Sequence, residues 1–177
     1  RQNGCATSVV GIGDTAVTLS VKGKLAGLVT AAGSAYCWGS GGVGQLGNGF
    51  TQRGSTYPAR VSGLESGVSD ISSGGTRACA VVSGAAMCWG LNVNGGLGDG
   101  FDTNETSIRN VPGAVFGLGA GVLSVESGAN ESCAMVTGGA AKCVGQQIQV
   151  LSRLQRAEVA DGEAVNTVVA PPLANLR

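Results

Sequence analysis

The apolar positions of this chain come in short runs that alternate with polar residues and are interrupted by glycine. The two most apolar stretches, Leu25–Trp38 and Gly113–Val125, are both broken by glycine, and both are shorter than the roughly 18 residues that span a bilayer. Such dense glycine argues against helices, because each one costs up to about 1 kcal/mol in a helix interior. The pattern predicts short strands joined by tight turns, with no membrane-spanning segment.

The pattern also repeats along the chain. The segment "AYCWGSGGVGQLGNGF" at residues 35–50 recurs as "AMCWGLNVNGGLGDGF" at residues 86–101, and a shortened copy, "AKCVGQQ", begins at Ala141. Upstream, "VSDISSGGTRACAVVSG" at residues 68–84 returns as "LSVESGANESCAMVTG" at residues 123–138. Units of about 50 residues built from short strands are typical of propeller blades. We therefore expect an all-β chain, a β-propeller-type array of about three four-stranded blades that forms a partial or open propeller.

The repeats set the expected organisation of the chain. Blade-like repeats are expected over residues 1–145, in units of about 1–57, 58–110 and 111–145. Residues 146–177 diverge from this pattern. They begin with helix formers that are compatible with a short C-terminal helix and continue into a valine-rich piece, so they form either a cap on the array or an unrelated tail.

A six-residue stretch that begins at Gly39 matches the G-x-G-x-x-G pattern of dinucleotide-binding turns. The copy 51 residues later has Asn92 in place of Gly41, and the sequence after Gly44 would not open a helix, as a dinucleotide site requires. We therefore expect no cofactor, and we assign these glycines to turns between strands. The positions that the two copies share, taken as structural residues of the repeat, are Trp38, Gly39, Gly44, Leu46, Gly47, Trp89, Gly90, Gly95, Leu97 and Gly98.

These segments resemble the repeats of the regulator of chromosome condensation family. "GGTRACAV" at residues 74–81 leads to "CWGLN" at residues 88–92, and "GQLG" at residues 44–47 is intact. The resemblance covers roughly residues 17–145 and implies blades of a seven-bladed propeller. The chain departs from the family pattern where Arg77 and Glu131 stand at the usual histidine position, and where Val144 stands at the usual tryptophan.

The six cysteines suggest cross-strand bridges. If Ser83-Gly84 is a two-residue hairpin loop, Cys79 faces Cys88, and a three-residue loop at residues 137–139 places Cys133 opposite Cys143. Directly opposed residues of antiparallel strands are close enough for a disulfide, so we predict Cys79–Cys88 and Cys133–Cys143 bridges. Gly27 or Leu28 would face Cys37, which leaves a Cys5–Cys37 bridge as a further candidate; the alternative is a set of reduced, buried thiols.

Composition excludes several classes of function. Lys plus Arg and Asp plus Glu number 11 each, which gives no support for binding nucleic acid or a membrane surface. There is no histidine, so Ser-His-Asp and Cys-His catalysis and imidazole zinc sites are excluded. The acids of "DGFDTNE" at residues 99–105 lack the order of a calcium loop, so no metal is expected. Asn104 and Asn130 begin glycosylation sequons.

These observations lead to a functional hypothesis. We expect a non-catalytic protein-interaction scaffold, not an enzyme, that is secreted or extracellular because disulfides form in oxidising compartments. Its protein partner is unknown, and further blades or self-association would cover the open faces of the array. The alternative, implied by the family resemblance, is guanine-nucleotide exchange or other regulation of a small GTPase in the cytoplasm or nucleus. A hydrolase that uses carboxylates is the third hypothesis, and no constellation of residues supports it.

Overall fold

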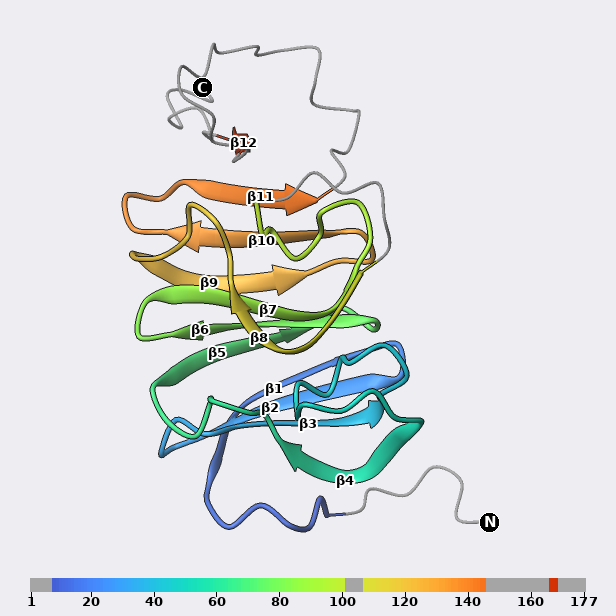
Figure 1. The fold of residues 1–177 in the computed structure, drawn as a ribbon. Coiled ribbons are helices and arrows are strands. Elements are labelled where there is room, and N and C mark those ends of the chain that lie inside the picture. The colour runs from blue at the N-terminus through green and yellow to red at the C-terminus, as the bar shows by residue number, and fades with distance from the viewer. Residues whose placement is uncertain (1–7, 101–106, 146–165, 169–177) are drawn as a thin grey trace, which may run out of the picture.

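The structure is a computed structural model that describes residues 8–100, 107–145 and 166–168. This part of the chain contains strands and no helix, which confirms the all-β expectation (Figure 1). The segment expected to form a C-terminal helix lies outside the described residues. The strands are β1 (Ala16–Lys22), β2 (Leu25–Thr30), β3 (Ala35–Ser40), β4 (Gly54–Arg60), β5 (Val68–Ser73), β6 (Arg77–Val82), β7 (Ala85–Asn92), β8 (Ser107–Ala114), β9 (Val122–Ser127), β10 (Glu131–Val136), β11 (Ala141–Gly145) and β12 (Asn166–Val168).

The strands form three four-stranded antiparallel sheets, which we call blades A, B and C. Blade A has the order β1-β2-β3-β4, blade B has β5-β6-β7-β8, and blade C has β9-β10-β11-β12. Figure 1 shows the blades stacked in chain order as an open array, with β5 in contact with both β1 and β9. This is the partial propeller expected from the repeats. Residues 57 and 110, at the ends of the expected units, lie within β4 and β8.

The core lies in the two joints between blades. One cluster of buried residues joins blades A and B and includes Leu25, Ile71 and Trp89. The other joins blades B and C and includes Val81 and Val125. Each sheet therefore buries its apolar side chains against the next sheet in the stack, as expected for propeller blades.

Short polar side chains join neighbouring blades along β1, β5 and β9. The Ser73 backbone N–H donates to Ser20 Oγ at 2.9 Å. Ser72 Oγ donates to Glu126 Oε2 at 2.6 Å and accepts from the Ser127 N–H at 2.9 Å. Because blade edges are otherwise unpaired, these bonds satisfy backbone donors and fix the offset of one blade against the next.

Each blade contains a glycine directly after the position of the repeated tryptophan. Gly90 has φ of +105°, and a Cβ placed there would lie 2.5 Å from the Thr76 carbonyl oxygen. Gly39 and Gly145 have φ of +105° and +106° at the equivalent positions. Glycine is required here both for its backbone conformation and for the close approach of the neighbouring strand, which explains its spacing without a cofactor.

Candidate functional site

The longest connections of blades A and B project from one end of the array. Residues 41–53 join β3 to β4, and residues 93–106 join β7 to β8, of which 101–106 lie outside the described part. The short turns 23–24, 74–76 and 128–130 meet at the same end, on the right in Figure 1. We call this side the loop end. Functional residues concentrate on loops that a rigid scaffold positions, so the loop end is the candidate site.

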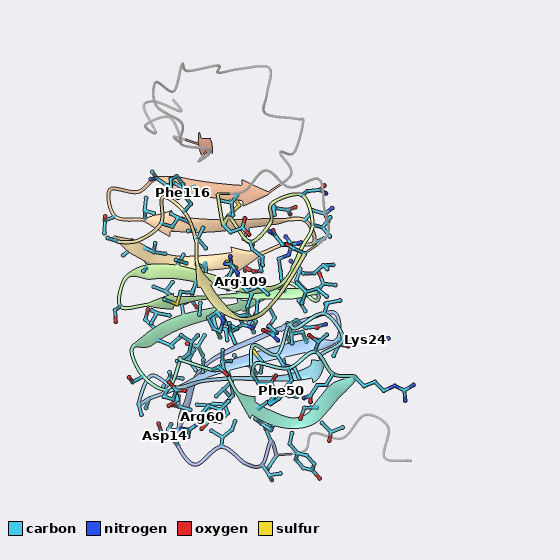
Figure 2. The ribbon with its side chains drawn as sticks, viewed as in Figure 1. Asp14, Lys24, Phe50, Arg60, Arg109 and Phe116 are labelled. Carbon is cyan, nitrogen blue, oxygen red and sulfur yellow. A yellow bond between two sulfur atoms is a disulfide. The ribbon has the colours of Figure 1, made fainter. Side chains whose placement is uncertain are left out.

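The blade A part of the loop end is basic. A shallow open hollow is lined by the exposed side chains of Lys24 and Arg53 together with Ser40, Ser55 and Thr56. Figure 2 shows Lys24 extending away from the ribbon at this end. Within the described residues, no ion pair involves Lys24 or Arg53. Their charges are therefore free to meet a partner.

The blade A loop is anchored to blade B. The indole N–H of Trp89 donates to the Gln45 carbonyl at 3.0 Å, and a Cβ on Gly47 would lie 2.6 Å from Trp89 Nε1. The Gly49 N–H donates to the Asn110 carbonyl at 2.9 Å, and Asn110 Nδ2 donates back to the Gly49 carbonyl at 2.8 Å. The loop is held on both sides and forms a fixed surface.

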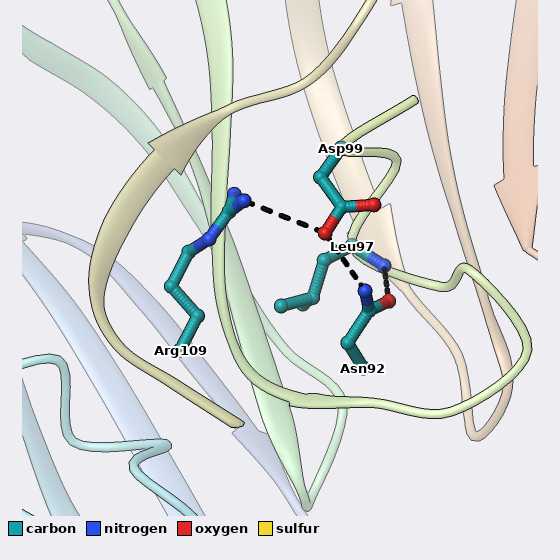
Figure 3. A network of polar contacts seen from close by, with 4 residues as sticks. All are labelled: Asn92, Leu97, Asp99 and Arg109. Carbon is teal, nitrogen blue, oxygen red and sulfur yellow. Dashed lines mark hydrogen bonds and ion pairs between the residues drawn. The ribbon is translucent and has the colours of Figure 1, made fainter. Parts of the chain in front are cut away.

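The blade B loop is held by a polar network of its own (Figure 3). Asn92 Nδ2 donates to Asp99 Oδ2 at 2.9 Å, and Asn92 Oδ1 accepts from the Leu97 N–H at 3.0 Å. Arg109 Nη2 lies 3.5 Å from the same Asp99 oxygen. Asn92 is buried, so its amide satisfies groups that water does not reach.

The opposite end of the array is compact. The connections 61–67 and 115–121 fold into tight turns, in which the Leu64 and Leu118 N–H groups donate to the Val61 and Val115 carbonyls. Asp14 accepts hydrogen bonds from the backbone N–H groups of Ala32 and Thr15, which hold its carboxyl pKa below the ordinary value. The backbone N–H groups named here are already engaged in local hydrogen bonds, to backbone carbonyls or to the Asp14 side chain.

Comparisons with known proteins identify the repeat. A model of the regulator of chromosome condensation (RCC1) repeat matches residues 32–81, which include the loop that accepts Trp89. Residues 32–81 are therefore assigned to the RCC1 repeat family. A bovine (Bos taurus) secretion-regulating guanine nucleotide exchange factor is 30% identical over 139 residues, 70% of this chain and 29% of the relative.

Solved structures share the fold of these RCC1 repeats. Human WBSCR16 superimposes with a TM-score of 0.67 at 23% identity, and yeast RCC1 (Prp20), solved bound to Kap60, with 0.68 at 22% identity. The matches cover 80% and 90% of this chain and 37% of each of those chains. The chain thus spans well under half the length of the relatives that it matches.

The comparisons overturn the leading functional hypothesis. A non-catalytic secreted scaffold was expected because the cysteines pair in register, whereas the bovine relative is an exchange factor. The physical reason is that cross-strand register alone brings cysteines together: Cα atoms lie 4.1 Å apart for Cys79 and Cys88. The facing cysteines therefore reflect the register of the hairpins and say little about whether the chain lies in an oxidising compartment. The alternative hypothesis, regulation of a GTPase, fits the relatives better.

The large apolar residues that the two copies share differ in burial. Leu46, Leu97 and Trp89 are completely buried, whereas Trp38, the equivalent of Trp89 in blade A, is only partly buried. The glycines assigned to turns, Gly39, Gly44, Gly47, Gly90, Gly95 and Gly98, all have positive φ. These residues therefore form the turns at the base of the loop end.

The structure contains two disulfides, Cys79–Cys88 and Cys133–Cys143. Cys37 is a free thiol, and Cys5, its candidate partner, lies outside the described residues. Cys37 is buried in the joint between blades A and B, where burial raises its pKa to about 12. A thiol held in its neutral form in an apolar core is unreactive.

The remaining candidate residues differ in their surroundings. Asn104 lies outside the described residues, and Asn130 is exposed in the turn between β9 and β10. Asp99, considered for calcium, binds Asn92 and Arg109 instead. Among the described residues, no cluster of three or more potential metal ligands and no helix able to cross a membrane is found.

Sequence reasoning missed the anchoring network of the blade B loop. Asn92 aligns with Gly41 in blade A and Asp99 with Asn48, so the network has no counterpart in the first copy. The usable signal was the appearance of Asn and Asp seven residues apart around a loop that otherwise repeats. Two polar side chains that appear together in one copy indicate a bond made only there.

Proposed function

We propose that this chain is part of a small-GTPase regulator of the guanine-nucleotide exchange type. The observation that carries the proposal is the 30% identity to a guanine nucleotide exchange factor over 139 residues. A second structure of the same yeast Prp20 was described together with the binding of that protein to Gsp1p and histones. A protein partner is therefore the class of ligand that this fold is known to take.

Nucleotide exchange suits a chain that lacks catalytic side chains. An exchange factor makes and breaks no covalent bond; it accelerates nucleotide release by binding the GTPase more tightly when its nucleotide is absent. What it needs is a rigid contact surface. Missing histidines and separated carboxylates therefore do not argue against this activity, although they do argue against hydrolysis.

The loop end is the surface we assign to the partner. Its two long loops are anchored by Trp89 and by Asn92, and its blade A part presents Lys24 and Arg53 to solvent. Charges of one sign on a rim steer an oppositely charged protein and increase its association rate. The partner surface is accordingly expected to be acidic where it meets blade A.

This proposal places the chain inside the cell, in the compartment of its GTPase. Structural disulfides are rare there, because thiol reductants keep cysteines reduced. The hairpin register would bring each cysteine pair together as thiols too. Counting free thiols by mass spectrometry after native isolation distinguishes reduced from bridged pairs.

The first test measures exchange directly. A panel of small GTPases that includes Gsp1p is loaded with a fluorescent guanine nucleotide, and nucleotide release is followed with and without the 177-residue chain. We expect binding to at least one member and faster release from it. Lys24→Glu with Arg53→Glu should weaken binding roughly tenfold or more at low salt and much less at high salt, because exposed charges are screened.

Lys142→Glu provides the matched control. Lys142 lies at the opposite end of the array, where its Nζ lies 3.5 Å from the Gly117 carbonyl. A Lys→Glu substitution there, which makes half the charge change of the double variant, should leave binding unaltered. If no GTPase of the panel binds, the proposed function is wrong. If one binds and the Lys24 and Arg53 variant binds equally well, only the assigned surface is wrong.

A further inference from the structure

Arg77 is a fully buried guanidinium between blades B and C. Its side chain has no exposed surface, and none of its three nitrogens, Nε, Nη1 and Nη2, has a hydrogen-bond partner. A buried charge without a partner is strongly unfavourable, which is why native structures pair such groups. The equivalent position in blade A holds Leu25, which is buried in the apolar core.

The chain makes space for the guanidinium through glycine. A Cβ on Gly96, in the blade B loop, would overlap Arg77 Nη1 and lie 2.6 Å from Cζ. A Cβ on Gly74 would lie 3.1 Å from Arg77 Cγ. The blade A loop has Gln45 where blade B has Gly96, so the small residue appears in the copy that contains the arginine.

Glu131 is the carboxylate placed to meet Arg77. It occupies in blade C the position that Arg77 occupies in blade B, and it is only partly buried, so its carboxylate can turn. A Cβ on Gly74 would lie 2.6 Å from the Gly128 carbonyl, and one on Gly128 would lie 2.7 Å from Glu131 Cδ. The Glu131 carboxyl thus lies over the turn at Gly128, which contacts the turn at Gly74 beside Arg77. Burial lowers the pKa of Arg77, and the negative charge of Glu131 raises it.

The joint between blades B and C lacks the contact that joins blades A and B. Trp89 donates to the Gln45 carbonyl in the first joint, but its equivalent in blade C is Val144. Ser132 Oγ donates to the Gly96 carbonyl instead, at 2.9 Å. The second joint thus replaces a large indole ring with smaller polar contacts around Gly96.

We propose that Arg77 and Glu131 form an ion pair across this joint and that Arg77 is a positioning residue for the blade B loop at Gly96. The pair gives the guanidinium the acceptor that burial demands and connects blade C to the loop above it. The planar guanidinium of arginine can donate two parallel hydrogen bonds to the two oxygens of one carboxylate. The inference does not depend on the proposed GTPase partner.

A double-mutant cycle tests the pair. Arg77→Leu, Glu131→Gln and the double variant are unfolded in urea, and their equilibrium constants are compared with that of the wild type. Glu131→Gln alone leaves the guanidinium unpaired and should raise the unfolding constant at least about tenfold. Arg77→Leu introduces the residue that blade A has at this position. The unfolding constant of the double variant should therefore rise much less than the product of the two single increases, and the coupling between the two changes should be about tenfold or more.

The control cycle combines Glu131→Gln with Arg60→Leu. Arg60 lies in β4, where it hydrogen-bonds Tyr36 at 3.0 Å, far along the chain from Glu131. These two changes should act independently. A coupling below about twofold between Arg77 and Glu131 would contradict the pair.

A spectroscopic readout covers the case in which Arg77→Leu does not fold. In the wild-type chain, the Nε–H proton of Arg77 should be resolved by NMR and exchange slowly with water, because it is buried and bonded. In Glu131→Gln, its exchange should accelerate and its resonance should shift. An unchanged Nε–H signal in the folded Glu131→Gln chain would overturn the inference.

Discussion

Ser132 carries a hydrogen bond that a tryptophan makes in the neighbouring blade. In blade B the facing residues of β6 and β7 are Ala78 and Trp89, and in blade C the facing residues of β10 and β11 are Ser132 and Val144. Each pair supplies one donor to the loop carbonyl of the preceding blade, from the indole in one case and from the hydroxyl in the other. In blade C, the residue equivalent to Ala78 carries a hydroxyl, and the residue equivalent to Trp89 has no ring.

The hydroxyl of Ser132 should therefore contribute measurably to the free energy of unfolding. Ser132→Ala leaves the buried Gly96 carbonyl without this donor and should cost about 1–3 kcal/mol of unfolding free energy, measured by urea denaturation. The reciprocal change, Ala78→Ser, adds a hydroxyl where Trp89 already satisfies the Gln45 carbonyl, so it should give no stabilisation. A neutral Ser132→Ala would show that water replaces the hydroxyl.

At the scale of strands and hairpins, most of the architecture could be predicted from sequence. The expected partners of the β6–β7 hairpin are those observed, from Val82 opposite Ala85 to Cys79 opposite Cys88. Local glycine and the alternation of side chains decide such registers. Blade C keeps the same pairing despite its extra residue, because the three-residue loop between Val136 and Ala140 absorbs it.

The register also resolves the choice between Gly27 and Leu28. Gly27 faces Cys37, as Cys79 faces Cys88 in blade B. Gly27→Cys should therefore form a third cross-strand disulfide under mild oxidation, and it should stabilise the chain by roughly 2–3 kcal/mol. A Cβ at Gly27 would lie 3.0 Å from Ile71 Cδ1, so Ile71→Val should accompany the change.

Thiol counting and denaturation check this disulfide. The engineered chain should lose the free thiol of Cys37 on oxidation, and the midpoint of its urea denaturation should rise. Adding reductant should lower this midpoint again. Gly27→Ser, also with Ile71→Val, imposes a similar steric demand without a second sulfur, so its stability should not respond to reductant. Persistence of the Cys37 thiol after oxidation would contradict the register.

At the scale of the whole molecule, the open array treats its two tryptophans differently. Trp89 is enclosed between blades A and B, whereas Trp38 lies on the side of blade A away from blade B and is partly exposed. On the same blade, Val17, Leu19 and Val21 of β1 are exposed. Blade A thus exposes an apolar face, whereas the equivalent face of blade B is covered by blade A.

Fluorescence quenching measures this asymmetry. The chain has two tryptophans, so Trp38→Phe isolates the emission of Trp89. We expect acrylamide to quench the wild type markedly and Trp38→Phe only weakly, with emission at shorter wavelength from the buried indole that remains. Equal quenching of both proteins would show that blade A is covered in solution.

The contacts that hold the blade B loop and Arg77 could not be predicted from sequence in the same way. Cysteine and glycine spacing reports on neighbours within a hairpin, but the Asn92–Asp99–Arg109 network and the place of Arg77 depend on which loop closes over which strand. Arg77 was visible only as a departure from the family pattern. Its burial beneath Gly96 follows from packing between segments that are far apart in the chain.

The exchange of Ala78–Trp89 for Ser132–Val144 restricts how such a repeat can diverge. If tryptophan is lost first, the loop carbonyl is left without a donor; if serine comes first, a hydroxyl enters beside an intact ring. The order in which serine comes first keeps a donor on the loop carbonyl at every step, so it is the less costly route between the two pairs.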